Sequence, residues 1–209
     1  MDTPRVEVDE VIATALLEHR TPRVRDEHAE KRAMDEMRRG LAGSPRSLLQ
    51  KLAEVALDLC NAQYAGVSLL EQSGEPRFCR WYAVSGEYRA WLWSTLPCAT
   101  SPCGPALEQH QPMLMIRPER CFSVLAQLRP PVEELLLVPF AVHGEIAGTV
   151  WVVSHDKERV FDSEDSRIMT ALTEFAAAAY EQLLSFGPEE LEALSRLYQI
   201  SEPPAERDP

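Results

Sequence analysis

Two long apolar runs, separated by only three residues, constrain the fold of this chain more than any other feature. Residues 135–142 read LLLVPFAV and residues 146–154 read IAGTVWVVS, with His143-Gly144-Glu145 between them. Their β-branched and aromatic residues predict two strands, and the intervening glycine predicts a tight hairpin. Because both runs are almost continuously apolar, other elements must cover both faces of the sheet that they form.

Helical patterns lie on either side of this hairpin. Ser44 is a good N-cap for a helix over residues 44–61, and Pro45 then occupies the first helical position, where its missing N–H costs nothing. A longer helix over residues 162–185, capped by Asp162, carries an apolar stripe at helical spacing. Further helices are expected over residues 6–19, over residues 26–39 and from Pro188 onwards.

The middle of the chain adds short strands and irregular segments. The pattern predicts strands over residues 65–70, 77–84 and 113–116, and helical turns over residues 119–128. Residues 88–96 favour a short helix, whereas residues 97–104 (PCATSPCG) predict a loop because two prolines and a glycine interrupt them. Antiparallel strand pairs with helices segregated at the ends indicate an α+β fold.

The charge of the chain excludes several classes of partner. It has 21 basic and 33 acidic residues, a formal net charge of −12. Nucleic-acid binding and docking on anionic lipid both need a basic face, so neither is expected. No apolar run approaches the roughly 18 residues that span a bilayer, and the acidic N-terminus does not resemble an export signal. We therefore expect a cytoplasmic protein whose five cysteines are reduced.

Six blocks between residues 44 and 182 follow one another in a characteristic order. They read LLQKLAEVALDLCNAQYAGVSLLE, SPCG, RPER-x-F, PP-x-EELLLVPF, G-x-IAGTVWVVSHD and FD-x-ED-x-R-x-MTALTEFAAAAY. Together they resemble the GAF domain, the small-molecule sensor module of signalling proteins. The blocks SPCG, RPER and WVVSHD are similar to those of a bacterial subgroup that usually precedes PAS and histidine-kinase modules.

The resemblance implies a six-stranded antiparallel sheet with the terminal helices packed on one face and a ligand cavity on the other. It divides the chain into a helical N-terminal extension (residues 1–43), a GAF domain (residues 44–185) and a C-terminal helix with an acidic tail (residues 186–209). It also implies a non-catalytic sensor of a bacterial two-component pathway, with a histidine kinase or a response regulator as partner. GAF domains bind many different ligands, so the cofactor is unknown.

We expect a ligand to lie between the sheet and residues 88–128, because irregular backbone between rigid strands tends to carry function. Glycine lets another group approach the backbone closely, and tryptophans with a few polar groups are typical pocket walls. The expected ligand-binding residues are Trp81, Trp91, Cys103, Gly104, Arg120, Phe122 and His155. The alternative is that the aromatic residues fill this space as a packed core.

The cysteines admit a second function. Cys98 and Cys103 lie five residues apart in the predicted loop, which is compatible with a thiol-based redox sensor or reductase on the same fold. The simpler interpretation is that Cys103 is a small buried side chain. The candidate metal ligands Cys98, Cys103, Cys121, His110 and His155 lack zinc-site spacing, so no metal is expected.

A third interpretation is a dimerisation adaptor without a ligand. Under each of the three, the apolar faces of the helices over residues 44–61 and 162–185 predict a homodimer, because exposed apolar stripes of that length mark interfaces.

Overall fold

A computed structural model describes residues 6–71, 76–86, 92 and 94–185 of the chain. Its α-helices are α1 (Leu16–His19), α2 (Glu27–Gly40), α3 (Pro45–Leu59), α4 (Cys103–Gln109) and α5 (Ser163–Ser185). Its strands are β1 (Tyr64–Glu71), β2 (Phe78–Ser85), β3 (Thr95–Pro97), β4 (Met113–Ile116), β5 (Glu134–Val142) and β6 (Glu145–Ser154). Short 3-10 turns are η1 (Val8–Glu10), η3 (Cys98–Thr100), η4 (Pro118–Arg120) and η5 (Ser123–Gln127).

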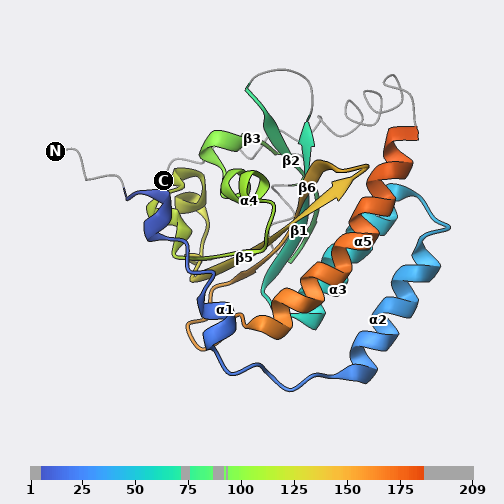
Figure 1. Ribbon diagram of the computed structural model, residues 1–209, viewed down its shortest axis with the longest axis horizontal. Coiled ribbons are helices and arrows are strands. Elements are labelled where there is room, and N and C mark those ends of the chain that lie inside the picture. Colours follow the sequence, from blue (N-terminus) through green and yellow to red (C-terminus); the bar gives the residue numbers. More distant parts are fainter. Residues whose placement is uncertain (1–5, 72–75, 87–91, 93, 186–209) are drawn as a thin grey trace, which may run out of the picture.

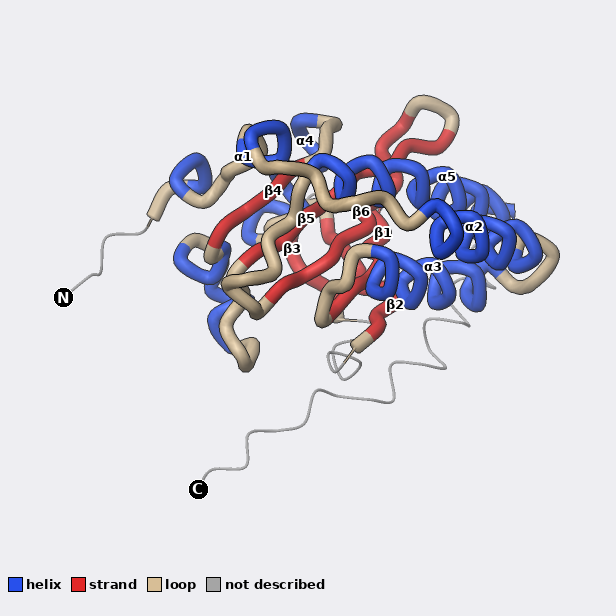
Figure 2. Tube along the Cα trace, turned by 90° about the horizontal axis from the view of Figure 1, so that it is seen from below, coloured by secondary structure: helices blue, strands red, loops and turns tan. Residues whose placement is uncertain are grey.

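The six strands form one antiparallel sheet in the order β3-β2-β1-β6-β5-β4. Helices α3 and α5 lie side by side along one face, and α2 lies against them (Figure 1). The long helices α2, α3 and α5 lie together (Figure 2). The sheet separates them from α4 and η5, whereas α1 contacts α5 and places Leu17 in the core on the side of the long helices. This arrangement confirms the predicted α+β fold with its six-stranded antiparallel sheet.

Each face of the sheet has its own hydrophobic core. The larger core joins the sheet to α3 and α5 and includes Leu52, Leu136 and Leu172, which are fully buried. The second core lies on the opposite face, under α4, η5 and the N-terminal segment. Burial on both faces explains why the strands β5 and β6 read as continuous apolar runs.

The predicted helix starts and the hairpin are confirmed. The Ser44 hydroxyl accepts a hydrogen bond from the Ser47 amide at 3.2 Å, and Asp162 accepts one from the Glu164 amide at 2.8 Å. The β5–β6 loop consists of His143 and Gly144, with φ angles of 54° and 85°. Two consecutive positive φ angles define the turn that best matches the twist of paired strands.

The N-terminal segment differs from the predicted helix over residues 6–19. It forms η1, a bridge between Ile12 and Met115, and then the single turn α1. The Ala13 amide donates to the Leu114 carbonyl at 2.8 Å, so this segment pairs with the edge strand β4. Val11 is buried and Ile12 is partly buried beside that edge, whereas Leu16 is exposed, and the gain in sheet hydrogen bonds outweighs local helix propensity.

The prediction of a loop over residues 97–104 was wrong, as was a helix reaching residue 96. Thr95 and Leu96 belong to strand β3, and η3 and α4 follow almost at once. Pro97 and Pro102 stand immediately before η3 and α4, where a missing amide hydrogen costs nothing. The helix predicted from Pro188 and the tail lie outside the described residues, as does most of the segment before β3. Across the described ranges, none of the helices has the length and apolar composition needed to cross a bilayer.

Candidate functional site

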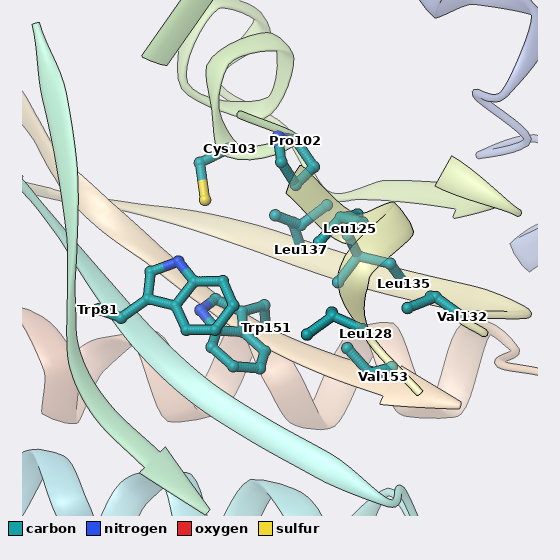
Figure 3. A pocket seen from close by; sticks show the side chains of 10 residues that line it. All are labelled: Trp81, Pro102, Cys103, Leu125, Leu128, Val132, Leu135, Leu137, Trp151 and Val153. Atoms are coloured by element: carbon teal, nitrogen blue, oxygen red, sulfur yellow. The ribbon is translucent and has the colours of Figure 1, made fainter. Parts of the chain in front are cut away.

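The face of the sheet opposite α3 and α5 carries a small apolar cavity (Figure 3). Its floor comes from β2, β5 and β6, and its walls from the start of α4 and from the segment around η5. The volume is about 20 Å³, enough for roughly one water molecule. The lining residues are Trp81, Pro102, Cys103, Leu125, Leu128, Val132, Leu135, Leu137, Trp151 and Val153.

Two tryptophans form one end of the floor. The ring centroids of Trp81 and Trp151 lie 5.0 Å apart with an interplanar angle of 49°. Trp151 pairs with Gly66 across β1 and β6, and a Cβ at Gly66 would lie 2.2 Å from the Trp151 ring. Gly66 therefore lets the indole lie across β1, where its Nε1–H donates to the Ser68 hydroxyl at 3.0 Å.

A group of hydroxyls surrounds the thiol of Cys103, which points from the start of α4 toward the sheet (Figure 3). The Thr149 hydroxyl donates to the Cys103 Sγ at 3.3 Å, and Ser68 pairs with Thr149 across the two strands. Hydrogen bonds from Cys79, Thr149, Ser101 and Ser68 hold the pKa of the Cys103 thiol below its usual range, although burial opposes them. Cys103 is therefore the thiol of this face that most readily ionises.

Two further thiols lie next to Cys103. The Sγ atoms of Cys79 and Cys98 are 3.0 Å apart, and both side chains are buried. The hydrogen bond with Cys103, together with burial, raises the pKa of the Cys79 thiol. Burial also raises the pKa of Cys98. All five cysteines lie within the described residues and are free thiols, and Cys60 is buried in the opposite core.

The structure brings four of the expected site residues to the same face of the sheet. Trp81 and Cys103 line the cavity, and Phe122 is buried in the core beneath it without being part of the lining. Gly104 lies directly behind Cys103, where a Cβ would be 2.3 Å from the carbonyl oxygen of Cys98. The group that approaches Gly104 closely is therefore the backbone of Cys98 rather than a ligand.

The other expected site residues lie elsewhere or outside the described part. Arg120 is exposed and donates to the Glu10 carbonyl at 3.2 Å, which fastens η4 to η1. His155 lies at the end of β6, with its Nδ1 2.5 Å from the Pro131 carbonyl and its ring edge-on to Tyr64. Trp91 falls outside the described residues. Their roles in ligand binding stay predictions.

Several residues of the site were not singled out from the sequence. Trp151 was not among the expected ligand-binding residues, and Leu125 and Leu128 carried no signal. Ser68 and Thr149 did carry one, because each is a hydroxyl residue that interrupts an apolar run. Cys79 lies far from Cys98 in sequence, so only the β2–β3 pairing reveals their contact.

The small volume of the cavity limits the size of a ligand that it can hold. Typical ligand pockets measure about 300–1,000 Å³, so a ligand of more than a few atoms requires rearrangement of the lining. Within the described residues, no group of three or more histidine, cysteine or acidic side chains is arranged to hold a metal ion. Among the described residues that line the cavity, the thiol of Cys103 is the one polar side chain apart from the indole N–H groups.

Solved structures with the same fold come from several kinds of protein. The GAF domain of a phosphoenolpyruvate-protein phosphotransferase from Acinetobacter superposes with a TM-score of 0.63 at 12% identity, covering 77% of this chain and 96% of that one. Free methionine-R-sulfoxide reductase from Neisseria meningitidis superposes with a TM-score of 0.58 at 13% identity, covering 78% and 96%. The second GAF domain of DevS from Mycobacterium smegmatis gives 0.53 at 19% identity, covering 72% and 99%. At these identities the likeness shows the fold alone.

The fold and the two-sided sheet thus define a GAF-like domain. A family model described as GAF domain matches residues 42–181, and the chain belongs to this family. The GAF fold is a regulatory or sensing fold, and its solved examples include both phytochrome domains and sulfoxide reductases. Among curated proteins the comparison finds no match.

Proposed function

We propose that this chain is a non-catalytic regulatory domain that binds a small, mostly apolar molecule over Trp81 and Trp151. The observation that carries the proposal is the cavity itself, an apolar space between a rigid sheet and a short irregular segment, with the thiol of Cys103 at one end. A ligand with one polar group directed at Cys103 and Thr149 would match this lining.

The wall formed by η5 supports binding that alters the conformation of the domain. Leu125 and Leu128 close the cavity. Leu125 lies in a 3-10 turn of only five residues and Leu128 directly follows that turn, whereas the floor belongs to strands of the sheet. Displacing these two side chains makes room for a ligand and shifts the segment that leads into β5. A ligand that favours the open arrangement thereby changes the surface that a partner reads.

A thiol reductase is the second candidate, and the lowered pKa of Cys103 favours it. Against it, the groups that hydrogen-bond Cys103 are hydroxyls and a thiol, rather than a histidine or carboxylate that would act as a general base. The side chain is also fully enclosed by the core. Binding without turnover is therefore the function that the geometry supports best.

The test uses tryptophan fluorescence and thermal denaturation across a panel of small apolar metabolites. Leu128→Phe fills the cavity, and Leu184→Phe makes the same change on the outer part of α5, where the side chain is half exposed. A ligand at 100 times its Kd adds about 2.7 kcal/mol of stability. We expect that stabilisation in the wild type and in Leu184→Phe, and its loss in Leu128→Phe.

A compound that stabilises wild type and Leu128→Phe equally binds elsewhere and overturns the proposal. Product formation that disappears in Cys103→Ser would establish the reductase instead. The two-component context rests on the resemblance of the SPCG, RPER and WVVSHD blocks. It predicts that the ligand changes the autophosphorylation rate of a histidine kinase that binds this domain.

A further inference from the structure

The second face of the sheet holds a pair of thiols that the proposed ligand site does not use. Cys79 lies in β2, and Cys98 is the first residue of η3. Pairing of β2 with β3 sets Cys79 opposite Leu96, and the Cys98 amide donates to the Arg77 carbonyl at 2.9 Å. The two cysteines are thus diagonal neighbours on the same face of the sheet, with their sulfurs 3.0 Å apart.

We propose that Cys79 and Cys98 form a reversible disulfide when a small peroxide oxidises them. The bond length of a disulfide is about 2 Å, so the two sulfurs need to approach by only about 1 Å. The pairing of β2 with β3, continued by the hydrogen bond from the Cys98 amide to Arg77, already holds the backbones of both cysteines in place. This inference does not depend on the identity, or the existence, of a cavity ligand.

The surroundings distinguish this pair from ordinary buried cysteines. Cys60 is buried in the opposite core, and burial there raises its thiol pKa. Burial also raises the pKa of the Cys98 thiol, but a hydrogen bond from Cys79 opposes that effect, and the next two residues, Ala99 and Thr100, are exposed, so Cys98 lies close to the protein surface. Cys103 supplies a third thiol next to Cys79.

The chemistry balances with hydrogen peroxide as the oxidant. Cys98 first loses its proton; burial opposes this ionisation, and the hydrogen bond from Cys79 favours it. The Cys98 thiolate attacks one peroxide oxygen, the O–O bond breaks, Cys98 becomes a sulfenic acid, and the hydroxide that leaves takes up a proton to form water. The Cys79 sulfur then attacks the Cys98 sulfur, and the sulfenic oxygen leaves as water with the proton of Cys79. The two thiols together lose two electrons and two protons, and the peroxide is reduced to two waters.

The disulfide would tie β2 to the start of α4. The carbonyl of Cys98 packs against Gly104, so fixing Cys98 also restrains the turn that carries Pro102 and Cys103. Trp81 lies two residues beyond Cys79, and its ring contacts Trp151. A change in the thiols should therefore alter tryptophan fluorescence at the cavity floor.

The experiment treats the full chain with hydrogen peroxide, quenches with an alkylating agent and measures intact mass without reductant. We expect the loss of two hydrogens, reversed by dithiothreitol, with a parallel reversible change in tryptophan fluorescence. Tryptic cleavage at Arg77 and Arg80 isolates Cys79, whereas Cys98 and Cys103 share one peptide. Fragmentation of the crosslinked peptide between residues 98 and 103 then identifies the partner.

Matched serine variants make the assignment independent of fragmentation. Cys121→Ser should form the disulfide at the wild-type rate and Cys103→Ser should still form it, whereas Cys98→Ser should lose two hydrogens at least about tenfold more slowly. Superimposable thermal unfolding of the reduced proteins checks that each variant folds, and Cys98→Ala replaces a serine variant that does not. A crosslink to Cys103, a wild-type rate in Cys98→Ser or Cys98→Ala, or oxidation to sulfinic acid without a crosslink overturns the proposal.

Discussion

Gly104 shows how one residue sets the position of a whole wall of the cavity. It follows Cys103 at the start of α4, and a Cβ there would lie 2.3 Å from the Cys98 carbonyl oxygen and 3.1 Å from its carbon. Backbone cannot move away as a flexible side chain can. The contact between η3 and α4 therefore exists only because residue 104 has no side chain.

We predict that Gly104→Ala lowers the free energy of unfolding by about 1–3 kcal/mol, the usual cost of overpacking a dense core. Chemical denaturation measures the loss. Gly40→Ala is the control, because its Cβ would meet only a methyl group of Leu48 at 3.1 Å and alanine favours the helix by up to about 1 kcal/mol. An equal loss in both variants would contradict the role assigned to Gly104.

We predict that Thr149 helps to lower the pKa of the Cys103 thiol. Its hydroxyl donates to the sulfur, which stabilises the thiolate and lowers the thiol pKa. Thr149→Val removes this donor, so the Cys103 pKa should rise and the thiolate should appear only at higher pH. The thiolate ultraviolet absorbance that Cys103→Ser abolishes reports the titration. Thr100→Val, a change at an exposed threonine, should leave it in place, and an unshifted curve in Thr149→Val would refute the prediction.

At the scale of elements, an ion pair fastens the N-terminal segment to the domain. The Arg20 guanidinium donates to both Glu134 oxygens, at 2.5 and 3.0 Å, and to the Phe161 carbonyl at 2.5 Å. Glu134 is buried and also accepts from the Phe161 amide at 2.8 Å. One arginine thus joins three parts of the chain: the segment after α1, strand β5 and the entry to α5.

We predict that Arg20→Met destabilises the fold by about 3 kcal/mol, because it leaves the buried carboxylate of Glu134 without its cation. Lys31→Met is the control: its pair with Asp35 is exposed, and such pairs contribute at most about 1 kcal/mol. Urea denaturation of the three proteins measures both effects. Similar stabilities for Arg20→Met and Lys31→Met would show that Glu134 finds another partner.

A second ion-pair cluster predicts how stability depends on pH. Arg167 lowers the pKa of Glu30 and of Glu164 below the ordinary value of 4.5 through direct hydrogen bonds. Because these folded pKa values lie below the unfolded one, the stabilisation is complete above pH 4.5 and is lost as the pH falls through the folded values. Burial raises the pKa of Asp165, so the contribution of Asp165 to the unfolding free energy changes with pH in the opposite direction.

The difference between wild type and Arg167→Met isolates this cluster from Asp165. We expect that difference in unfolding free energy to be largest near neutral pH and to shrink as the pH falls below about 4.5. Urea titrations at a series of pH values measure it, with Arg38→Met, an exposed pair with Asp35, as the control. A difference that stays constant with pH would contradict the assignment.

The sequence predicted the elements whose signals are local and missed those that depend on distant partners. Helices α3 and α5 and the β5–β6 hairpin follow from caps, periodicity and a glycine turn, all within one segment. The local pattern predicted a helix over residues 11–13. It missed their pairing with β4, because that strand lies about a hundred positions further along the chain. Tertiary packing likewise produces the contact of Cys79 with Cys98 and the cavity wall formed by Leu125 and Leu128. The local sequence therefore gave no indication of either.

At the scale of the whole molecule, the sheet separates two regions of different character. The face under α3 and α5 is a dense core of large side chains, several of them fully buried. The other face carries the small cavity, the thiols of Cys79, Cys98 and Cys103, and the hydroxyls around Cys103. Strands of the sheet contribute side chains to both faces, so under the proposed function they would connect the ligand site to the long helices.

The last prediction concerns that helical layer. Helix α2 lies against α3, so the surface left for a second copy is centred on the outer side of α5 (Figure 1). There Leu184 is 51% exposed and Ala178 is half-buried, which permits close packing of two helices. We expect a homodimer through this surface at about 50 µM and a dimer at least about tenfold weaker in Leu184→Glu. Val24→Glu is the control, because Val24 is 92% exposed and lies near the start of α5, where the adjacent Arg23 bonds Asp165, at the opposite end of the helix from Leu184. Sedimentation equilibrium distinguishes the outcomes. A wild-type monomer at that concentration would contradict the homodimer, and equal weakening by both substitutions would place the interface elsewhere.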